Sequence, residues 1–317
     1  NTLNIIVYVK QGVKDGVTIT FIALSAWDLA NCALCLMTVV CFIINDHFPL
    51  RDADILAIQY VYIGYTRGCT YVLSTIVTVY LSIERCICIV VPFKVKDIFT
   101  KTRAVYTNIG IVVFGMACFA PAWATQTLQW KADDARNMTR LVLLVSDNRR
   151  QIDIFVDTFN GIVLPTVAQI IITISAFIMI SGIKSSAKFR QRAAVEGQTQ
   201  GVAAKHANGV RESPKEIDGS SKVMTNKDAR VAQVVVLVAV IFFICNLPVL
   251  LVAYTRPFVP EMDVGKAYYS LYTLVYTIVY AAGLVNASVN FFVYYNVSTK
   301  FREVFLSVFC GKTTKSK

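Results

Sequence analysis

Charged residues and histidine are scarce in this chain of 317 residues. Asp, Glu, Lys and Arg make up 16% of it and hydrophobic residues 56%, whereas a soluble chain carries about 25% charged residues. There are two histidines, His47 and His206, and the membrane topology predicted below places them on opposite sides of the membrane. The cysteines show no metal-binding spacing. The shortage of charge excludes an ordinary soluble protein, and the missing metal cluster and nucleophile–base pair argue against an enzyme.

The hydrophobic residues gather in runs long enough to cross a bilayer, for which about 20 residues are needed. There are six such runs, at 18–44, 55–83, 104–130, 154–183, 231–255 and 267–299. A seventh helix is expected at the start, where 1–9 is apolar but too short to span. It is interpreted as the inner half of a truncated first helix. The predicted fold is therefore an all-α bundle of seven transmembrane helices, forming one domain over 1–299.

The basic residues are distributed unequally between the two predicted sides of the membrane. If the N-terminus is outside, every second connection between the helices lies inside. These inner connections carry 22 of the 31 Lys and Arg residues, and their net charge is +13, against −2 for the outer connections. The inner connections are 10–17, 84–103, 184–230 and 300–317. This bias predicts an outer N-terminus, a cytoplasmic C-terminus and a basic face toward anionic lipid and a cytosolic partner, with no need for nucleic acid.

The longest polar stretch, 184–228, is rich in Lys, Gly, Ser and Gln, which favours a flexible inner loop. Its ends, near Ile183-Lys184 and Asp228-Ala229-Arg230, are expected to extend the fifth and sixth helices into the cytosol. Beyond the last span, apolar residues recur at helical spacing in 300–317, at Phe301, Val304, Phe305 and Val308. This pattern predicts a short amphipathic helix on the inner leaflet, followed by a cytoplasmic tail. Cys310 follows the helix and is either a palmitoylation site or a free thiol.

Short motifs recur in a fixed order along the spans. They are Asn1, Leu24-Ser25-Ala26-Trp27-Asp28, Glu84-Arg85-Cys86, Pro92-Phe93, Pro165, Phe242-Phe243-Ile244-Cys245-Asn246-Leu247-Pro248, Asn290-Phe291-Phe292-Val293-Tyr294 and Phe301-Arg302. In this order they resemble the rhodopsin-like, G-protein-coupled receptors over nearly the whole chain. The finer pattern is similar to gastropod-type chemosensory and neuropeptide receptors. The resemblance implies an extracellular ligand and a heterotrimeric G protein as partners, and no cofactor other than an allosteric Na⁺.

The resemblance implies that Glu84, Arg85, Pro92, Phe93, Asn290 and Tyr294 serve coupling and activation. Arg85 is a cation at the inner membrane edge and needs an anionic partner at rest. Glu84 is adjacent, and Asp228 lies 20 residues before Pro248, about 30 Å along the sixth helix and level with Arg85. An Arg85–Asp228 pair would hold the third and sixth helices together. The alternative is that Asp228 is a solvated residue at the loop edge.

Asp28 is a lone carboxylate inside a span, which is costly and usually functional. By the family's packing, Ser74 faces it from the third helix, Asn286 and Asn290 from the seventh, and Asn1 from the first. Hard oxygen ligands around one carboxylate suit the Na⁺ that the family implies. A water-filled polar network around a protonated Asp28 is the alternative.

Arg67 lies 18 residues before Arg85, about 27 Å away along the helix, in the outer part of the bundle where the family binds ligands. It either binds an anionic group of a ligand through forked hydrogen bonds or is neutralised by Asp157, at similar depth on the fifth helix. Tyr71, Tyr276 and Tyr280 are predicted to line the same cavity. A basic residue at this place argues against a simple amine ligand.

Several family features are missing. Tyr60 stands where the family has a disulfide cysteine, and the second outer loop has no cysteine, so the usual outer disulfide cannot form. Asn246 replaces a Trp in the sixth helix and Phe291 replaces the seventh-helix proline. The fourth helix has Ile111 where its usual Trp would stand. These departures bear more on the ligand than on the fold.

Asn137 lies in a sequon of the predicted second outer loop and is a glycosylation acceptor. A membrane transporter remains an alternative function. Transporters tend to carry paired repeats and helices broken at the midplane, and no repeat is visible in this chain. If the protein is a receptor, the sequence does not distinguish a chemosensory ligand from a neuropeptide ligand.

Overall fold

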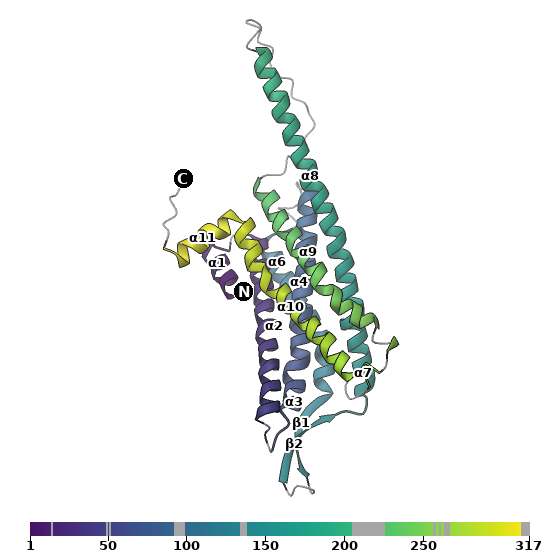
Figure 1. Cartoon of the computed structure of the whole chain (residues 1–317). Helices are drawn as coiled ribbons and strands as arrows, with labels where there is room; N and C mark the ends of the chain where they lie inside the picture. The colour runs from purple at the N-terminus through teal and green to yellow at the C-terminus, as the bar shows by residue number, and fades with distance from the viewer. Residues whose placement is uncertain are drawn as a thin grey trace.

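The computed structural model of the chain describes residues 1–13, 15–48, 50, 52–91, 99–133, 138–204, 226–255, 258–259, 261–262 and 267–311. Helices dominate these residues, and Figure 1 shows them aligned as one elongated bundle. In chain order the elements are α1 (Thr2–Lys10), α2 (Gly16–His47), α3 (Ile55–Gln59), η1 (Tyr60–Gly64), α4 (Tyr65–Val90), α6 (Lys101–Ala124), β1 (Gln126–Asp133), β2 (Met138–Val145), α7 (Arg149–Val156), η2 (Asp157–Val163), α8 (Leu164–Ala204), α9 (Asn226–Thr255), α10 (Tyr269–Val297) and α11 (Thr299–Phe309).

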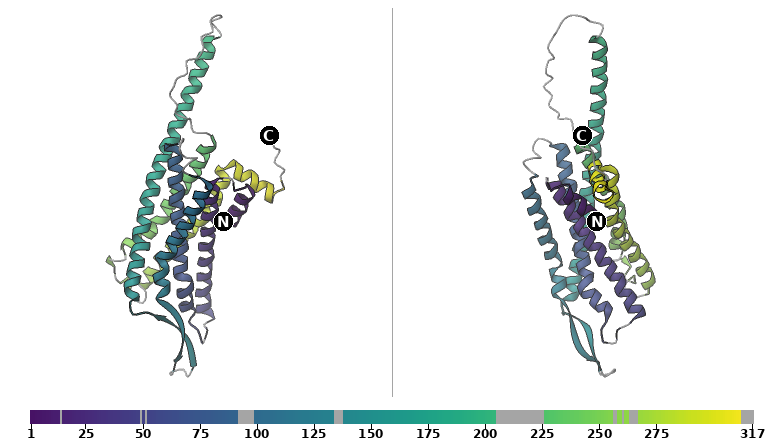
Figure 2. Two further views of the ribbon diagram at one scale, coloured as in Figure 1. Left: turned by 180° about the vertical axis from the view of Figure 1, so that it is seen from behind. Right: turned by 90° about the vertical axis from the view of Figure 1, so that its left-hand side faces the viewer.

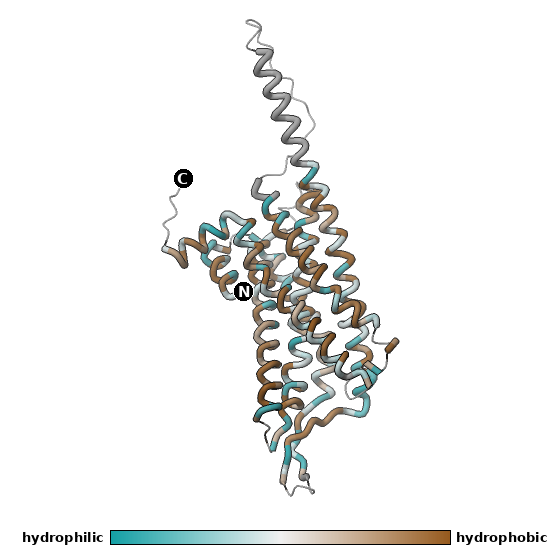
Figure 3. Tube along the Cα trace, in the orientation of Figure 1, coloured by the Kyte–Doolittle hydropathy of each residue, from teal (hydrophilic) through white to brown (hydrophobic). Residues whose placement is uncertain are grey.

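Within the described residues, six helical stretches are long and apolar enough to cross a membrane. They are Gly16–His47, Ile55–Val90, Lys101–Ala124, Arg149–Ser185, Arg230–Thr255 and Ser270–Val297. Large apolar side chains point outward along them, and Figure 3 shows the hydrophobic colouring concentrated on these helices. A bundle that is apolar on its outside as well as its inside suits a lipid surrounding. The six predicted runs are therefore confirmed as helical spans.

The short helix α1 completes the bundle at one of its ends. The ring of Tyr8 stacks on Phe21 of α2 with 5.3 Å between centroids, and it meets Phe301 of α11 edge-on at 5.3 Å. The Asn1 side chain donates to the carbonyl of Ala287 in α10 at 2.8 Å. Helix α1 thus packs beside α11 as the first of seven helices, and we call this side the α11 end (Figure 1). Counted from α1, the second to seventh spans are Gly16–His47, Ile55–Val90, Lys101–Ala124, Arg149–Ser185, Arg230–Thr255 and Ser270–Val297.

A β-hairpin stands at the opposite end of the bundle, which we call the hairpin end (Figure 2). Strands β1 and β2 pair antiparallel from Gln126↔Val145 to Asp133↔Met138. The sequence predicted a helical run through 104–130, but helix α6 ends at Ala124 and the last residues of that run form β1. A short apolar run does not by its composition distinguish a helix from a strand, and here the partner strand 138–145 decides.

Helix α8 extends far beyond the bundle at the α11 end, where Figure 1 shows it projecting as a single rod. It runs to Ala204, and α9 begins at Asn226. The predicted flexible loop 184–228 is therefore helical at both of its ends. Its central part, 205–225, lies outside the described residues. The predicted extension of the fifth and sixth helices into this stretch is confirmed, but the sequence did not reveal that the fifth helix continues as far as Ala204.

Helix α4 lies in the middle of the bundle and packs against α2, α6, α8 and α9. Small residues on its neighbours allow this close approach. A Cβ on Gly115 of α6 would lie 2.5 Å from Leu73 Cδ2, and one on Gly182 of α8 would lie 2.3 Å from Ile89 Cγ2. Van der Waals packing through small residues is the usual means of helix association in lipid. The central helix therefore positions the residues described below relative to the other spans.

Candidate functional site

The buried carboxylate Asp28 joins three of the spans. Asp28 of α2 is 2% exposed, Ser74 of α4 is 6% exposed and Asn290 of α10 is 4% exposed. The hydroxyl of Ser74 donates to Asp28 Oδ1 at 2.5 Å, and Asn290 Nδ2 donates to Asp28 Oδ2 at 2.8 Å. The structure thus brings together three of the residues that the sequence predicted for a sodium site.

Further oxygen atoms on the same face of α2 lack partners. Ser25 and Asn31 lie three residues before and after Asp28, and their Oγ and Oδ1 atoms are buried without a hydrogen-bond partner among the described residues. One carboxylate surrounded by neutral oxygens is the donor set of a small, hard cation. Asn286 is half-buried one turn from Asn290, and Asn1 binds the backbone of α10 at Ala287. The sodium site itself stays a prediction, and of its predicted donors Ser74 and Asn290 contact Asp28 directly.

Arg67 lies in the half of α4 nearer the hairpin end. Its guanidinium sits over the ring of Tyr280 of α10, 4.2 Å from the centroid. Tyr276 lies between Tyr272 and Tyr280, with ring centroids 4.4 and 6.1 Å away. The structure therefore brings Arg67, Tyr276 and Tyr280 together, as predicted. A cation placed on a ring face keeps the N–H edge of its fork available for an anion.

Two other residues predicted for the ligand site have different surroundings. One turn below Arg67, the hydroxyl of Tyr71 donates a hydrogen bond to Asn246 Oδ1 of α9. Asn246 is 3% exposed, and its Nδ2 has no partner among the described residues. Asp157 is exposed at the start of η2. The alternative pairing of Arg67 with Asp157 stays a prediction.

Glu84 and Arg85 lie at the α11 end of α4. Arg85 Nη2 donates to Glu84 Oε1 at 2.8 Å, and the side chains are 11% and 1% exposed respectively. Glu84 Oε2 and Arg85 Nε are buried without a hydrogen-bond partner among the described residues. Asp228 lies within α9, but its side chain is outside the described part of the chain, so the Arg85–Asp228 lock stays a prediction.

Another contact ties α9 to the α11 end of the bundle. Arg230 Nη1 donates to Thr299 Oγ1 of α11 at 2.7 Å. Nearby, Tyr294 is 0% exposed and its ring meets Phe21 edge-on at 5.1 Å, while its hydroxyl has no partner among the described residues. Phe291, which replaces the seventh-helix proline, meets Phe305 of α11 edge-on at 5.3 Å. Tyr294 also lies 5.7 Å from Phe301 of α11 between ring centroids, so aromatic packing joins this predicted activation residue to α11.

The remaining predicted sites concern the surface. Pro92, Phe93 and Asn137 lie outside the described residues. Cys310 caps the end of α11 and is exposed, next to exposed Val308 and Phe309, so its thiol is accessible. That position agrees with a lipid-facing helix end.

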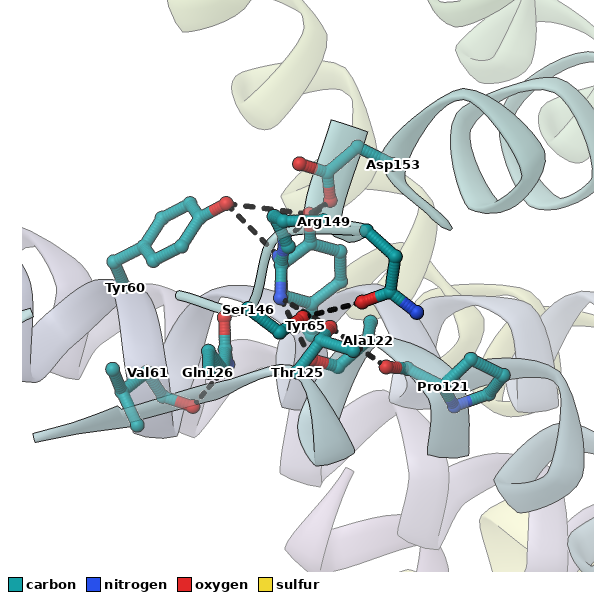
Figure 4. A network of polar contacts seen from close by, with 11 residues as sticks. Tyr60, Val61, Tyr65, Pro121, Ala122, Thr125, Gln126, Ser146, Arg149 and Asp153 are labelled. Atoms are coloured by element: carbon teal, nitrogen blue, oxygen red, sulfur yellow. Dashed lines mark hydrogen bonds and ion pairs between the residues drawn. The ribbon is translucent and has the colours of Figure 1, made fainter. Parts of the chain in front are cut away.

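The sequence reasoning missed one polar network, which Figure 4 shows at the hairpin end. Its centre is Arg149, the first residue of α7, which is 6% exposed. An arginine at the boundary of an apolar run was counted only as a loop charge. The signal that could have found it is Asp153 four residues later, on the same helix face.

These observations define a helical, multi-pass membrane protein with a buried carboxylate at its centre and an acid–arginine pair at one end. The family model for "7 transmembrane receptor (rhodopsin family)" matches residues 1–294. The chain therefore belongs to the rhodopsin family of seven-transmembrane receptors. No curated protein is similar enough to this chain to be matched to it.

Proposed function

We propose that this receptor binds an extracellular ligand carrying an anionic group and, in response, activates a heterotrimeric G protein. The observation that carries the ligand class is the half-buried Arg67 guanidinium, which lies over Tyr280 and belongs to no ion pair among the described residues. A cation held on a ring face within the bundle is a costly feature that an anionic ligand group would stabilise.

The coupling half of the proposal is supported by Glu84 and Arg85. They lie at the α11 end, far along α4 from Arg67, where the sequence concentrates its basic residues. With the charge bias read by the positive-inside rule, this end faces the cytoplasm and the hairpin end faces outward, in the plasma membrane. Release of the Glu84–Arg85 pair would free the guanidinium for contact with the G protein.

A peptide is favoured over a small ligand by the hairpin. Trp130 is 62% exposed, and Leu143, Leu144 and Val145 are each at least 37% exposed. The edge of β1 that faces away from β2 has no strand partner among the described residues. An exposed apolar strand with a free edge can pair with an extended peptide, whose carboxylate would reach Arg67. A small chemosensory anion would use Arg67 alone.

Na⁺ is proposed as an allosteric ligand of the Asp28 site. Asp28 would supply the charge, and the oxygens of Ser74, Ser25, Asn31 and the α10 asparagines would complete the donor set. The ion would neutralise the buried carboxylate and hold α2, α4 and α10 in one arrangement.

The test is a screen of acidic peptides and small carboxylates on cells that express the full-length receptor, read by G-protein activation. An acidic agonist whose potency falls in Arg67→Ala but not in Arg150→Ala, an exposed cation at the hairpin end outside both strands, supports the proposal. Substrate flux through reconstituted receptor without nucleotide exchange would instead support the transporter alternative.

A further inference from the structure

Arg149 occupies the place where three spans and the hairpin meet. It begins the fifth span, four residues after β2 ends. Its Nη1 donates to the carbonyl of Ala122 at 2.8 Å and to Thr125 Oγ1 at 3.0 Å, both at the end of the fourth span. Its Nη2 donates to Tyr60 Oη of the third span at 3.0 Å. One side chain therefore bridges the third, fourth and fifth spans (Figure 4).

The chemistry of these contacts explains why arginine is needed. The Ala122 carbonyl is one of the last four in α6, which have no amide partner within the helix. A cation at a helix C-terminus also interacts favourably with the helix dipole. The planar fork of arginine presents five N–H donors in fixed directions, so it can serve the carbonyl, Thr125 and Tyr60 at once. A lysine has no such fork.

The positive charge of Arg149 is balanced within the same network. Its Nε lies 2.8 Å from Asp153 Oδ1, one helical turn along α7. The hydroxyl of Tyr65 donates to the same carboxylate oxygen at 2.7 Å. The guanidinium also lies 4.9 Å from the centroid of the Tyr65 ring and 5.6 Å from that of Tyr60. A buried cation with an anion, hydrogen-bond acceptors and ring faces around it is stable only while all of them stay in place.

Two hydrogen bonds, one between backbone groups and one from a side chain, connect this network with the hairpin. The Ser146 amide donates to the Thr125 carbonyl at 3.1 Å, which closes the base of the hairpin beside Arg149. Gln126, the first residue of β1, donates from Nε2 to the Val61 carbonyl of η1 at 2.9 Å. The hairpin is therefore fixed to the third span by the same group of residues.

We propose that this Arg149 clamp, formed by Arg149 with Tyr60, Tyr65, Ala122, Thr125 and Asp153, replaces a disulfide as the tether between the third span and the hairpin. Tyr60 stands at the position where the family's disulfide cysteine is expected, and no cysteine occurs in 126–157. The clamp thus joins the same two parts of the chain by noncovalent contacts. The clamp includes Tyr65, which lies two residues before Arg67 on α4. Arg149 is therefore a positioning residue, which holds the part of α4 that carries Arg67.

That Arg149 positions Arg67 for ligand binding rests on the function proposed above, whereas the clamp itself does not depend on that function. Its test therefore uses hydrogen–deuterium exchange on the full chain in lipid nanodiscs, without ligand or G protein. Arg149→Ala is compared with Arg150→Ala, since Arg150 is the adjacent, exposed arginine of the same helix. We expect exchange in 126–133, 138–145 and 60–67 to rise on the order of tenfold or more in Arg149→Ala, because charge-assisted contacts are lost. Arg150→Ala should leave exchange unchanged.

The spatial pattern separates a clamp from a general loss of structure. Exchange in α11 should stay at the wild-type rate in Arg149→Ala, because α11 lies at the far end of the bundle. An equal rise in α11, or no rise in the hairpin, would overturn the proposal.

Milder variants keep the test decisive if Arg149→Ala does not fold. Tyr60→Phe removes one acceptor and keeps the ring, so it should give a smaller rise confined to the same segments. Arg149→Lys keeps the charge without the fork and should not restore wild-type exchange. Unchanged exchange in both would count against the clamp.

Discussion

The Glu84–Arg85 pair makes a quantitative prediction about activity without ligand. Glu84→Gln keeps the size of a side chain that is 1% exposed but removes its charge from a contact of 2.8 Å. A hydrogen bond to a charged group contributes about 1.5–3 kcal/mol and a neutral one about 1 kcal/mol. The substitution therefore weakens the resting pair by about 0.5–2 kcal/mol, which raises the active fraction roughly 2- to 30-fold.

The assay is basal nucleotide exchange on a G protein in membranes that contain equal amounts of each receptor. Glu303→Gln is the matched control, because Glu303 is an exposed acid of α11 at the same end of the bundle. We expect Glu84→Gln to raise basal exchange, Glu303→Gln to leave it unchanged and Arg85→Ala to abolish it. A Glu84→Gln receptor that folds normally and shows wild-type basal exchange would refute this role of the pair.

Three further predictions follow from the other contacts. Replacing KCl by NaCl at constant ionic strength should stabilise the wild type against thermal unfolding, by about 1.4 kcal/mol at a Na⁺ concentration ten times the dissociation constant. In Asp28→Asn, thermal melting should show no such stabilisation by Na⁺. An equal response of both proteins to Na⁺ would favour the water-filled network. Arg67→Lys should weaken an acidic agonist less than Arg67→Ala does, since it keeps the charge but not the fork, and equal potencies in concentration–response curves would exclude Arg67 from binding. Tyr71→Phe removes the hydrogen bond between α4 and α9 and should lower stability by about 1 kcal/mol while raising basal exchange, whereas a rise in stability would contradict the bond's role.

The spans and several site residues could be predicted from the sequence because lipid imposes simple rules on it. Long apolar runs with single polar interruptions mark both the helices and the positions that need an explanation. Asp28, Ser74 and Asn290 were expected to meet, and they form one hydrogen-bonded group. Arg67 and Tyr280 were expected at the same depth, and they are in contact.

The hairpin and the clamp could not be predicted because they depend on contacts between distant segments. Gln126–Trp130 has no ionised side chain and so continues the uncharged run of the helix before it. Its pairing with β2, as in Trp130↔Leu141, makes it a strand. Arg149 lies at the edge of an apolar run, where a charge is ordinary. Its role depends on Ala122 and Tyr60, which lie 27 and 89 residues away. The sequence likewise predicted that the fifth helix extends beyond the membrane, but its composition did not reveal an extension as long as that to Ala204.

Nucleotide exchange by purified receptor tests the central claim most directly. Wild-type, Glu84→Gln and Arg85→Ala receptors in nanodiscs are each mixed with purified heterotrimers of every G-protein class, and GTP analogue uptake is followed. The account predicts uptake above that of the G protein alone for the wild type with at least one class. It also predicts more uptake with Glu84→Gln and none above background with Arg85→Ala. Folded receptors that stimulate no class of heterotrimer, with Glu84→Gln as silent as Arg85→Ala, would contradict it.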